Sequence, residues 1–191
     1  MRILQFPESN VPSLLRRQVL ALQEQVWPSD VPPPPDAIEP VHDPALNPIS
    51  MLLINGHTVV AALDVLTKTI EHAGQSFLAS GLSTVVTDSA RRGQGHGQTL
   101  VVAAREFIAT TMADIGLFTC DPPLLGFYQR CGWEYVPGGV LIGGTPDDPF
   151  PSDGLNKVTL GAWFSAHGRN YAATFPHSHV ALYPGTIDRL W

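Results

Sequence analysis

The chain has 191 residues, of which 44% are apolar and 15% are charged; this composition excludes a disordered or fibrous chain and indicates one folded domain over residues 1–191. The net charge of −6, without a basic stripe, argues against a nucleic-acid partner and favours a cationic or amine-bearing one. No apolar run reaches the ~20 residues of a membrane helix, and the first residues lack the apolar core of a signal peptide, so we expect a cytoplasmic protein without a membrane partner.

The N-terminal part of the chain predicts a short strand, a helix and a stiff loop. The strand is expected at residues 2–6. Apolar residues recur at helical spacing over residues 12–27, and Pro28, the next residue, ends this helix. Four consecutive prolines at residues 32–35 exclude a helix or a central strand. They favour an extended loop inside the domain over a linker between domains.

Three consecutive antiparallel strands are expected next. They cover residues 51–54, 58–70 and 75–87. Asn55-Gly56 is a strong turn signal between the first two strands, and residues 72–75 mark a weaker turn before the third.

The following segment predicts a helix, a strand and a second helix. One apolar face runs over residues 100–108, and a short strand is expected at residues 115–119. The second helix is expected over residues 122–130 and closes at Gly132, which can adopt the left-handed cap conformation.

The rest of the chain carries weaker signals. Residues 138–151 are expected to be rich in loops, residues 155–164 form another strand, and the last 25 residues show turns without a clear period. The order of elements predicts a mixed α/β domain whose central sheet begins antiparallel.

Three glycines alternate directly after the third strand and before the helix, at Gly93, Gly95 and Gly97. Free backbone N–H groups at a helix start bind anions, and glycine lets phosphate oxygens approach the backbone. The lysine of a Walker loop is missing, because Gln98 and Thr99 follow the last glycine. The Gly-x-Gly-x-x-Gly spacing of dinucleotide-binding folds also fails.

The pattern Arg92-x-x-Gly95-x-Gly97 resembles the pyrophosphate loop of the GCN5-related N-acetyltransferases (GNAT), which hold coenzyme A there. Residues 124–134 are similar to a second signature of that family, a helix with a tyrosine (Tyr128) followed by a Gly-Trp strand entry. Within the family, residues 59–133, 145–148 and 188–191 resemble the aminoglycoside 2'-N-acetyltransferases. The resemblance implies the GNAT acyl-CoA N-acyltransferase fold, an α+β mixed sheet with antiparallel N-terminal strands, splayed central strands and helices on both faces.

The resemblance also implies the reaction and the co-substrate. Acetyl passes from acetyl-CoA to a primary amine of a small cationic acceptor, such as an aminoglycoside-like aminosugar, by direct attack in a ternary complex. Tyr128 would act as general acid on the departing thiolate. No metal is implied, and a homodimer is compatible with the resemblance. The implied coenzyme A contacts are Val85 and Val86 for the pantetheine arm and, for the diphosphate, Arg92, Gly93, Gln94, Gly95, His96, Gly97 and Gln98.

The general base is the point where this sequence departs from related aminoglycoside enzymes, which carry a glutamate where Ser83 stands here. If His72 faces Gln75 across the turn, Asp64 lies opposite Ser83, with the two side chains ~5 Å apart. We therefore expect Asp64, through Ser83 or a water molecule, to replace the missing glutamate. The alternative is a carboxylate on a solvated face of the hairpin.

The acceptor pocket is expected to form from the loop at residues 27–43, the loop at residues 138–150 and the C-terminal residues. These segments supply aromatic faces and negative charge, which a polyamine or aminosugar needs. Two other functions stay open: acetylation of a peptide or protein amine, and a non-catalytic acyl-CoA-binding regulatory module, since the expected glutamate is missing. The predicted acceptor residues are Trp27, Asp43, Asp147, Asp188 and Trp191 with its carboxylate.

Overall fold

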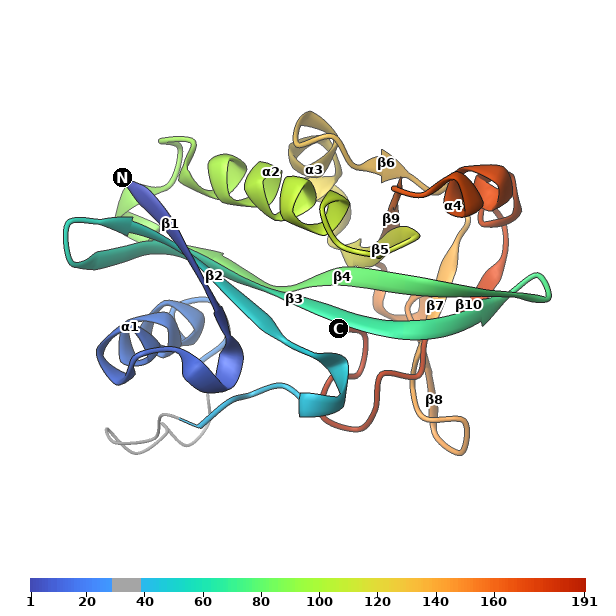
Figure 1. The fold of residues 1–191 in the computed structure, drawn as a ribbon, viewed down its shortest axis with the longest axis horizontal. Helices are drawn as coiled ribbons and strands as arrows, with labels where there is room; N and C mark the ends of the chain where they lie inside the picture. Colours follow the sequence, from blue (N-terminus) through green and yellow to red (C-terminus); the bar gives the residue numbers. More distant parts are fainter. Residues whose placement is uncertain (29–38) are drawn as a thin grey trace.

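The structure is a computed structural model that describes residues 1–28 and 39–191; the proline run at 32–35 and its predicted loop lie outside the described residues. A seven-stranded sheet in the order β1-β2-β3-β4-β5-β9-β6 forms its centre (Figure 1). Its strands are β1 (Arg2–Pro7), β2 (Ile49–Asn55), β3 (Thr58–His72), β4 (Gln75–Thr87), β5 (Ile115–Cys120), β6 (Glu134–Tyr135) and β9 (Val158–Trp163).

The first four strands pair antiparallel. The sequence predicted this arrangement for β2, β3 and β4, and the structure adds β1 beside β2. Gly56 adopts a φ of 62° in the turn between β2 and β3, and His72 pairs with Gln75 at the turn between β3 and β4. The expected register is therefore confirmed, and Asp64 lies directly opposite Ser83.

Helices cover both faces of the sheet. Helix α1 (Ser13–Glu24) packs Val19 and Leu22 on one face, against apolar residues of β2, β3 and β4. Helix α2 (His96–Ala109) packs on the opposite face, with α3 (Leu125–Arg130) beside it (Figure 1). No helix among the described residues is long and apolar enough to cross a membrane.

The central strands β4 and β5 separate after two pairs, as expected. They are parallel and pair only at Ala79–Ile115 and Ser80–Gly116. Strand β4 continues to Thr87, and its pairing with β3 shifts between Ala62 and Asp64, while Thr84 adopts a φ of 49°. This bulge bends β4 away from β5, so that the edge of β4 beyond Ser80 has no neighbouring strand among the described residues on the β5 side.

The expectation of loops at residues 138–151 is wrong. Strands β7 (Val140–Gly144), β8 (Pro149–Pro151) and β10 (His179–Ala181) form a second sheet in the order β10-β7-β8. Helix α4 (Ala166–Tyr171) also falls in the region without a clear period. Strands this short, interrupted by glycine and proline, carry no alternating pattern that sequence reasoning can detect.

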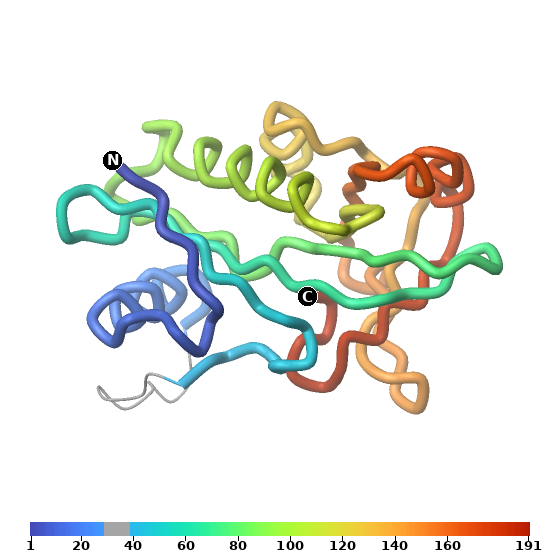
Figure 2. Tube along the Cα trace, viewed as in Figure 1, coloured from blue at the N-terminus to red at the C-terminus, as the bar shows by residue number. Residues whose placement is uncertain are grey.

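The last nine residues first contact β7 of the second sheet and then reach the main sheet. Tyr183 and Gly185 donate backbone hydrogen bonds to β7, and Gly144 donates one to Arg189. The chain trace in Figure 2 then ends over the middle of the sheet, where the indole of Trp191 donates to the carbonyl oxygen of Leu117 on β5 at 2.8 Å. We call residues 183–191 the closing segment.

Candidate active site

The glycine segment forms a tight turn between β4 and α2. Gly93 and Gly95 have φ angles of 77° and 81°, which side-chain-bearing residues rarely adopt, and Gly95 is the N-cap of α2. Gly97 lies against β4, because a Cβ there would sit 2.9 Å from the Thr87 hydroxyl oxygen. The sequence thus folds the loop directly onto the end of the strand.

The backbone amides of this loop are available to a ligand. Within residues 1–28 and 39–191, no amide of residues 92–98 donates to a protein acceptor, and Thr99 is the first to do so, to the Gly95 carbonyl oxygen at 2.9 Å. Free N–H groups at the positive end of a 14-residue helix favour a phosphate. The predicted diphosphate site therefore has the donors that it requires.

A pocket of about 600 Å³ joins this loop to the free edge of β4 and to α3. Val85, Val86 and Tyr128 line it, as expected from the resemblance. Arg91 and Arg130 also line it and were not predicted, because an isolated arginine carries no sequence signal for a phosphate. His96 lies at its wall, 8% exposed, with no partner for Nε2 among the described residues.

Tyr128 lies at the inner side of this pocket. Its ring makes edge contacts with Phe118 and Phe127, and 5% of the residue is exposed. Burial raises the pKa of the phenol well above its usual value, so the group holds its proton at physiological pH. Burial also raises the pKa of the Cys120 thiol to about 11, which argues against Cys120 as a nucleophile.

Asp64 is 2% exposed, so the alternative of a solvated carboxylate is wrong. Its Oδ1 accepts a hydrogen bond from the Ser50 hydroxyl at 2.5 Å, and its Oδ2 accepts one from the Thr84 hydroxyl at 2.6 Å. The hydroxyl that β4 offers to Asp64 is therefore that of Thr84, at the bulge, and not that of its paired neighbour Ser83.

His42 connects Asp64 to the closing segment. Its Nε2 lies 3.3 Å from Asp64 Oδ2, a charge contact without an aligned hydrogen bond, while Nδ1 donates a short hydrogen bond to Asp188. The second oxygen of Asp188 accepts from the Asp43 amide at 2.8 Å. Sequence reasoning missed His42, because it stands in a proline-rich loop, 146 residues from Asp188.

The buried network contains one positively charged imidazolium, that of His42, and two carboxylates, those of Asp64 and Asp188. Burial by itself lowers the pKa of His42, but the hydrogen bond that His42 donates to Asp188 and the contact with Asp64 outweigh this effect and raise the pKa to about 10. Burial likewise acts to raise the pKa of Asp64, but the His42 cation and the two hydroxyls lower it. Asp64 is thus a carboxylate that binds a proton weakly.

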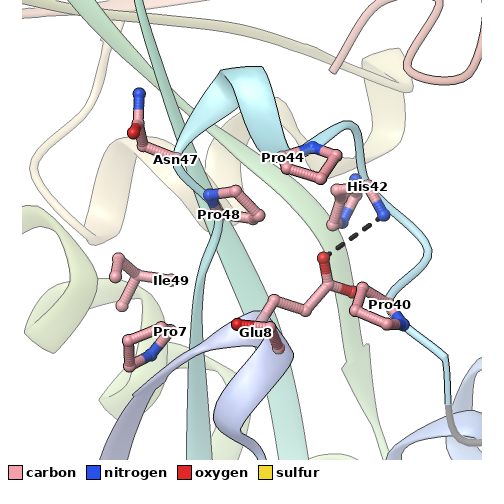
Figure 3. A pocket seen from close by; sticks show the side chains of 9 residues that line it. Pro7, Glu8, Pro40, His42, Pro44, Asn47, Pro48 and Ile49 are labelled. Atoms are coloured by element: carbon pink, nitrogen blue, oxygen red, sulfur yellow. Dashed lines mark hydrogen bonds between the residues drawn. The ribbon is translucent and has the colours of Figure 1, made fainter.

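Glu8 fixes the position of the loop that carries His42. Glu8 accepts hydrogen bonds from the amides of Val41 and His42, and pairs with Arg16 of α1 at 2.6 Å. Figure 3 shows Glu8 and His42 at a pocket of about 340 Å³ whose other walls include four prolines. Glu8, His42 and Asp64 lie close enough to hold a metal ion, but Arg16 and the amides already occupy the Glu8 oxygens.

The predicted acceptor residues do not all meet. Asp43 and Asp188 meet where the closing segment contacts the 39–48 loop, while Trp191, three residues further on, bonds the Leu117 carbonyl oxygen of the sheet. Trp27 is 52% exposed and follows Val26, which lines the pocket of about 600 Å³ at the glycine loop. Asp147 lies in the exposed turn between β7 and β8. Within the described part of the chain, no hydrogen bond joins Trp27 or Asp147 to Asp188.

The divergent strands, the free edge of β4 and the glycine loop at the start of α2 define an acyltransferase architecture. The family model described as "Acetyltransferase (GNAT) domain" matches residues 15–136, and the chain belongs to this family. It is an N-acetyltransferase with acetyl-CoA as co-substrate. No curated protein matches the sequence.

Solved structures share the fold at low sequence identity. Escherichia coli ElaA is 18% identical, with a TM-score of 0.58 over 84% of this chain and 99% of that one. An aminoglycoside 6'-N-acetyltransferase solved with coenzyme A is 16% identical, with a TM-score of 0.59 over 86% and 98%. Glucosamine-6-phosphate N-acetyltransferase from Arabidopsis thaliana is 16% identical, with a TM-score of 0.56 over 70% and 90%.

Proposed function

We propose that the protein acetylates a primary amine of a small cationic acceptor, an aminoglycoside-like aminosugar of the kind used by the 2'-N-acetyltransferases that the sequence resembles. The observation that carries this proposal is an excess of carboxylates beside the splayed strands. Asp64 and Asp188 flank the His42 cation, and the half-buried Asp43 adds a further negative charge. The net negative charge of this cluster attracts a polyamine and disfavours an acceptor that carries phosphate.

The co-substrate is held by main-chain groups. The amides of residues 92–98 would bind the diphosphate, and Arg92 and Arg130 at the same pocket would add positive charge. The edge of β4 at Val85 and Val86, free of β5, would pair with the amide groups of pantetheine as an added strand does. These contacts place the thioester beside the acceptor and remove the entropic cost of bringing the two together.

The transfer step also needs a proton donor for the departing thiolate of coenzyme A. The phenol of Tyr128 keeps its proton at the pocket, and in the proposed reaction it donates that proton to the thiolate as the bond to the acetyl carbon breaks. The surroundings of Asp64 favour a positioning role over the base expected from the sequence, because both its oxygens already accept hydrogen bonds. The amine therefore attacks after losing its proton to water.

An acceptor screen tests this proposal. Acetyl-CoA is incubated with gentamicin- and tobramycin-like aminosugars, spermidine, amino acids and a peptide with a free N-terminus, and products are identified by mass. Acetylation of an aminosugar supports the proposal. Acetylation of the peptide alone favours a protein N-acetyltransferase, and binding of coenzyme A without any product favours a regulatory module. The Tyr128→Phe variant serves as a control that keeps the pocket but lacks the acid.

A further inference from the structure

The indole of Trp191 fills the gap between β4 and β5 at the point where the two strands separate. The last pair of the parallel ladder is Ser80–Gly116, and the indole lies beside the next residue of each strand, Gly81 and Leu117. In a continuous sheet the Leu117 carbonyl oxygen would accept from β4; here it accepts from the indole N–H at 2.8 Å. The ring thus replaces a missing strand contact at the apex of the gap.

Gly81 makes room for this ring. A Cβ at that position would overlap Nε1 and Cε2 of the indole, so any side chain there would expel it. Trp191 is only 9% exposed, which means that the ring is packed into the sheet and does not lie on its surface. The indole of Trp191 can therefore occupy this position only because residue 81 is a glycine.

The closing segment holds the ring in this position. Asp188 is fixed by His42 and by the Asp43 amide, three residues before Trp191. The Gly144 amide donates to the Arg189 carbonyl oxygen at 2.8 Å, and Lys68 donates to the Tyr183 carbonyl oxygen at 2.7 Å. These anchors on two sheets and a loop leave the indole little freedom to move aside.

We propose that Trp191 is the end wall of the acyl site and limits the co-substrate to a short acyl group. This rests on the proposed coenzyme A position, with the diphosphate at residues 92–98 and the arm along Val85 and Val86. An acyl group on that arm points along β4 from Thr87 toward Gly81. Val85 and Gly81 are four residues apart, about 13 Å along a strand, and the indole closes the far end of this span.

Calorimetric binding of acetyl-, propionyl- and butyryl-CoA tests the wall without any acceptor, so an error in the proposed acceptor leaves the result unchanged. The wild-type protein is expected to bind acetyl-CoA about tenfold more tightly than butyryl-CoA, the size of effect that extra methylenes have in a closed apolar pocket. Trp191→Ala opens the apex, and the ratio is expected to fall to about threefold or less through tighter butyryl-CoA binding.

Two further variants guard against a loss of folding. Trp191→Phe keeps most of the ring volume and loses the bond to Leu117, so an intermediate ratio is expected. Trp163→Phe, at a half-buried indole on β9 that bonds Glu134, is the matched control and should leave the ratio as in the wild type. Equal binding of the three thioesters by the wild-type protein would overturn the inference, as would a ratio that Trp191→Phe and a folded Trp191→Ala leave unchanged.

Discussion

Replacing His42 with phenylalanine removes the cation that lies between two buried carboxylates. Phenylalanine keeps a flat ring but no charge, so Asp64 and Asp188 would stay buried without their shared partner. The pKa of His42, raised to about 10, gives the magnitude. At pH 7 the protonated ring contributes about 4 kcal/mol to the free energy of unfolding, since each pKa unit corresponds to about 1.4 kcal/mol. Removing one partner of a buried ion pair costs a similar amount, about 3–5 kcal/mol.

The pH dependence has a definite sign. Because the pKa of His42 in the folded protein lies above the ordinary value of 6.5, its stabilisation is fully present below pH 6.5 and is lost as the pH rises toward 10. Urea denaturation across this range should show a falling free energy of unfolding for the wild-type protein and a flatter profile for His42→Phe. The exposed His57 offers the control His57→Phe, which is expected to change stability by less than about 0.5 kcal/mol. A His42→Phe variant within about 1 kcal/mol of the wild type, with the same pH profile, would refute this reasoning.

Three further predictions concern the site itself. Tyr128→Phe should lower kcat by about 10²–10⁴-fold and leave the calorimetric Kd of acetyl-CoA unchanged; an unaltered kcat would exclude Tyr128 as the acid. Gly95→Ala places a side chain at a φ of 81°, which costs about 1–2 kcal/mol, so coenzyme A should bind about tenfold more weakly by calorimetry. Gly154→Ala, in open space without a positive φ, should bind coenzyme A as the wild type does. Asp43→Asn should raise the KM of a cationic acceptor several-fold in steady-state kinetics without changing the KM of acetyl-CoA, and equal acceptor KM values would remove Asp43 from the acceptor site.

The features that the sequence predicted correctly depend on local signals. The turn at residues 72–75 sets the register of β3 and β4. The pairing of His72 with Gln75 at this turn then places Asp64 opposite Ser83 further along the two strands. Gly93 and Gly95 were recognisable because only glycine readily takes their φ angles. In both cases the information lies within a few consecutive residues.

The features that it missed depend on contacts between distant segments. His42 stands in a loop with no periodic pattern, and its role is visible only when Asp188 returns from the other end of the chain. The bulge at Thr84 likewise decides which hydroxyl reaches Asp64, and a regular register would have favoured Ser83. The place of Trp191 was also beyond sequence reasoning, because it requires both the separation of β4 from β5 and the missing side chain at Gly81.

The central claim is that the main-chain amides of residues 92–98 hold the diphosphate of coenzyme A, and backbone-amide NMR during a titration with coenzyme A tests it most directly. We predict that the largest chemical-shift changes fall on these amides, with those of Gly93, Gly95 and Gly97 foremost. Saturable binding whose shift changes lie elsewhere, with these seven amides unperturbed, would contradict the account.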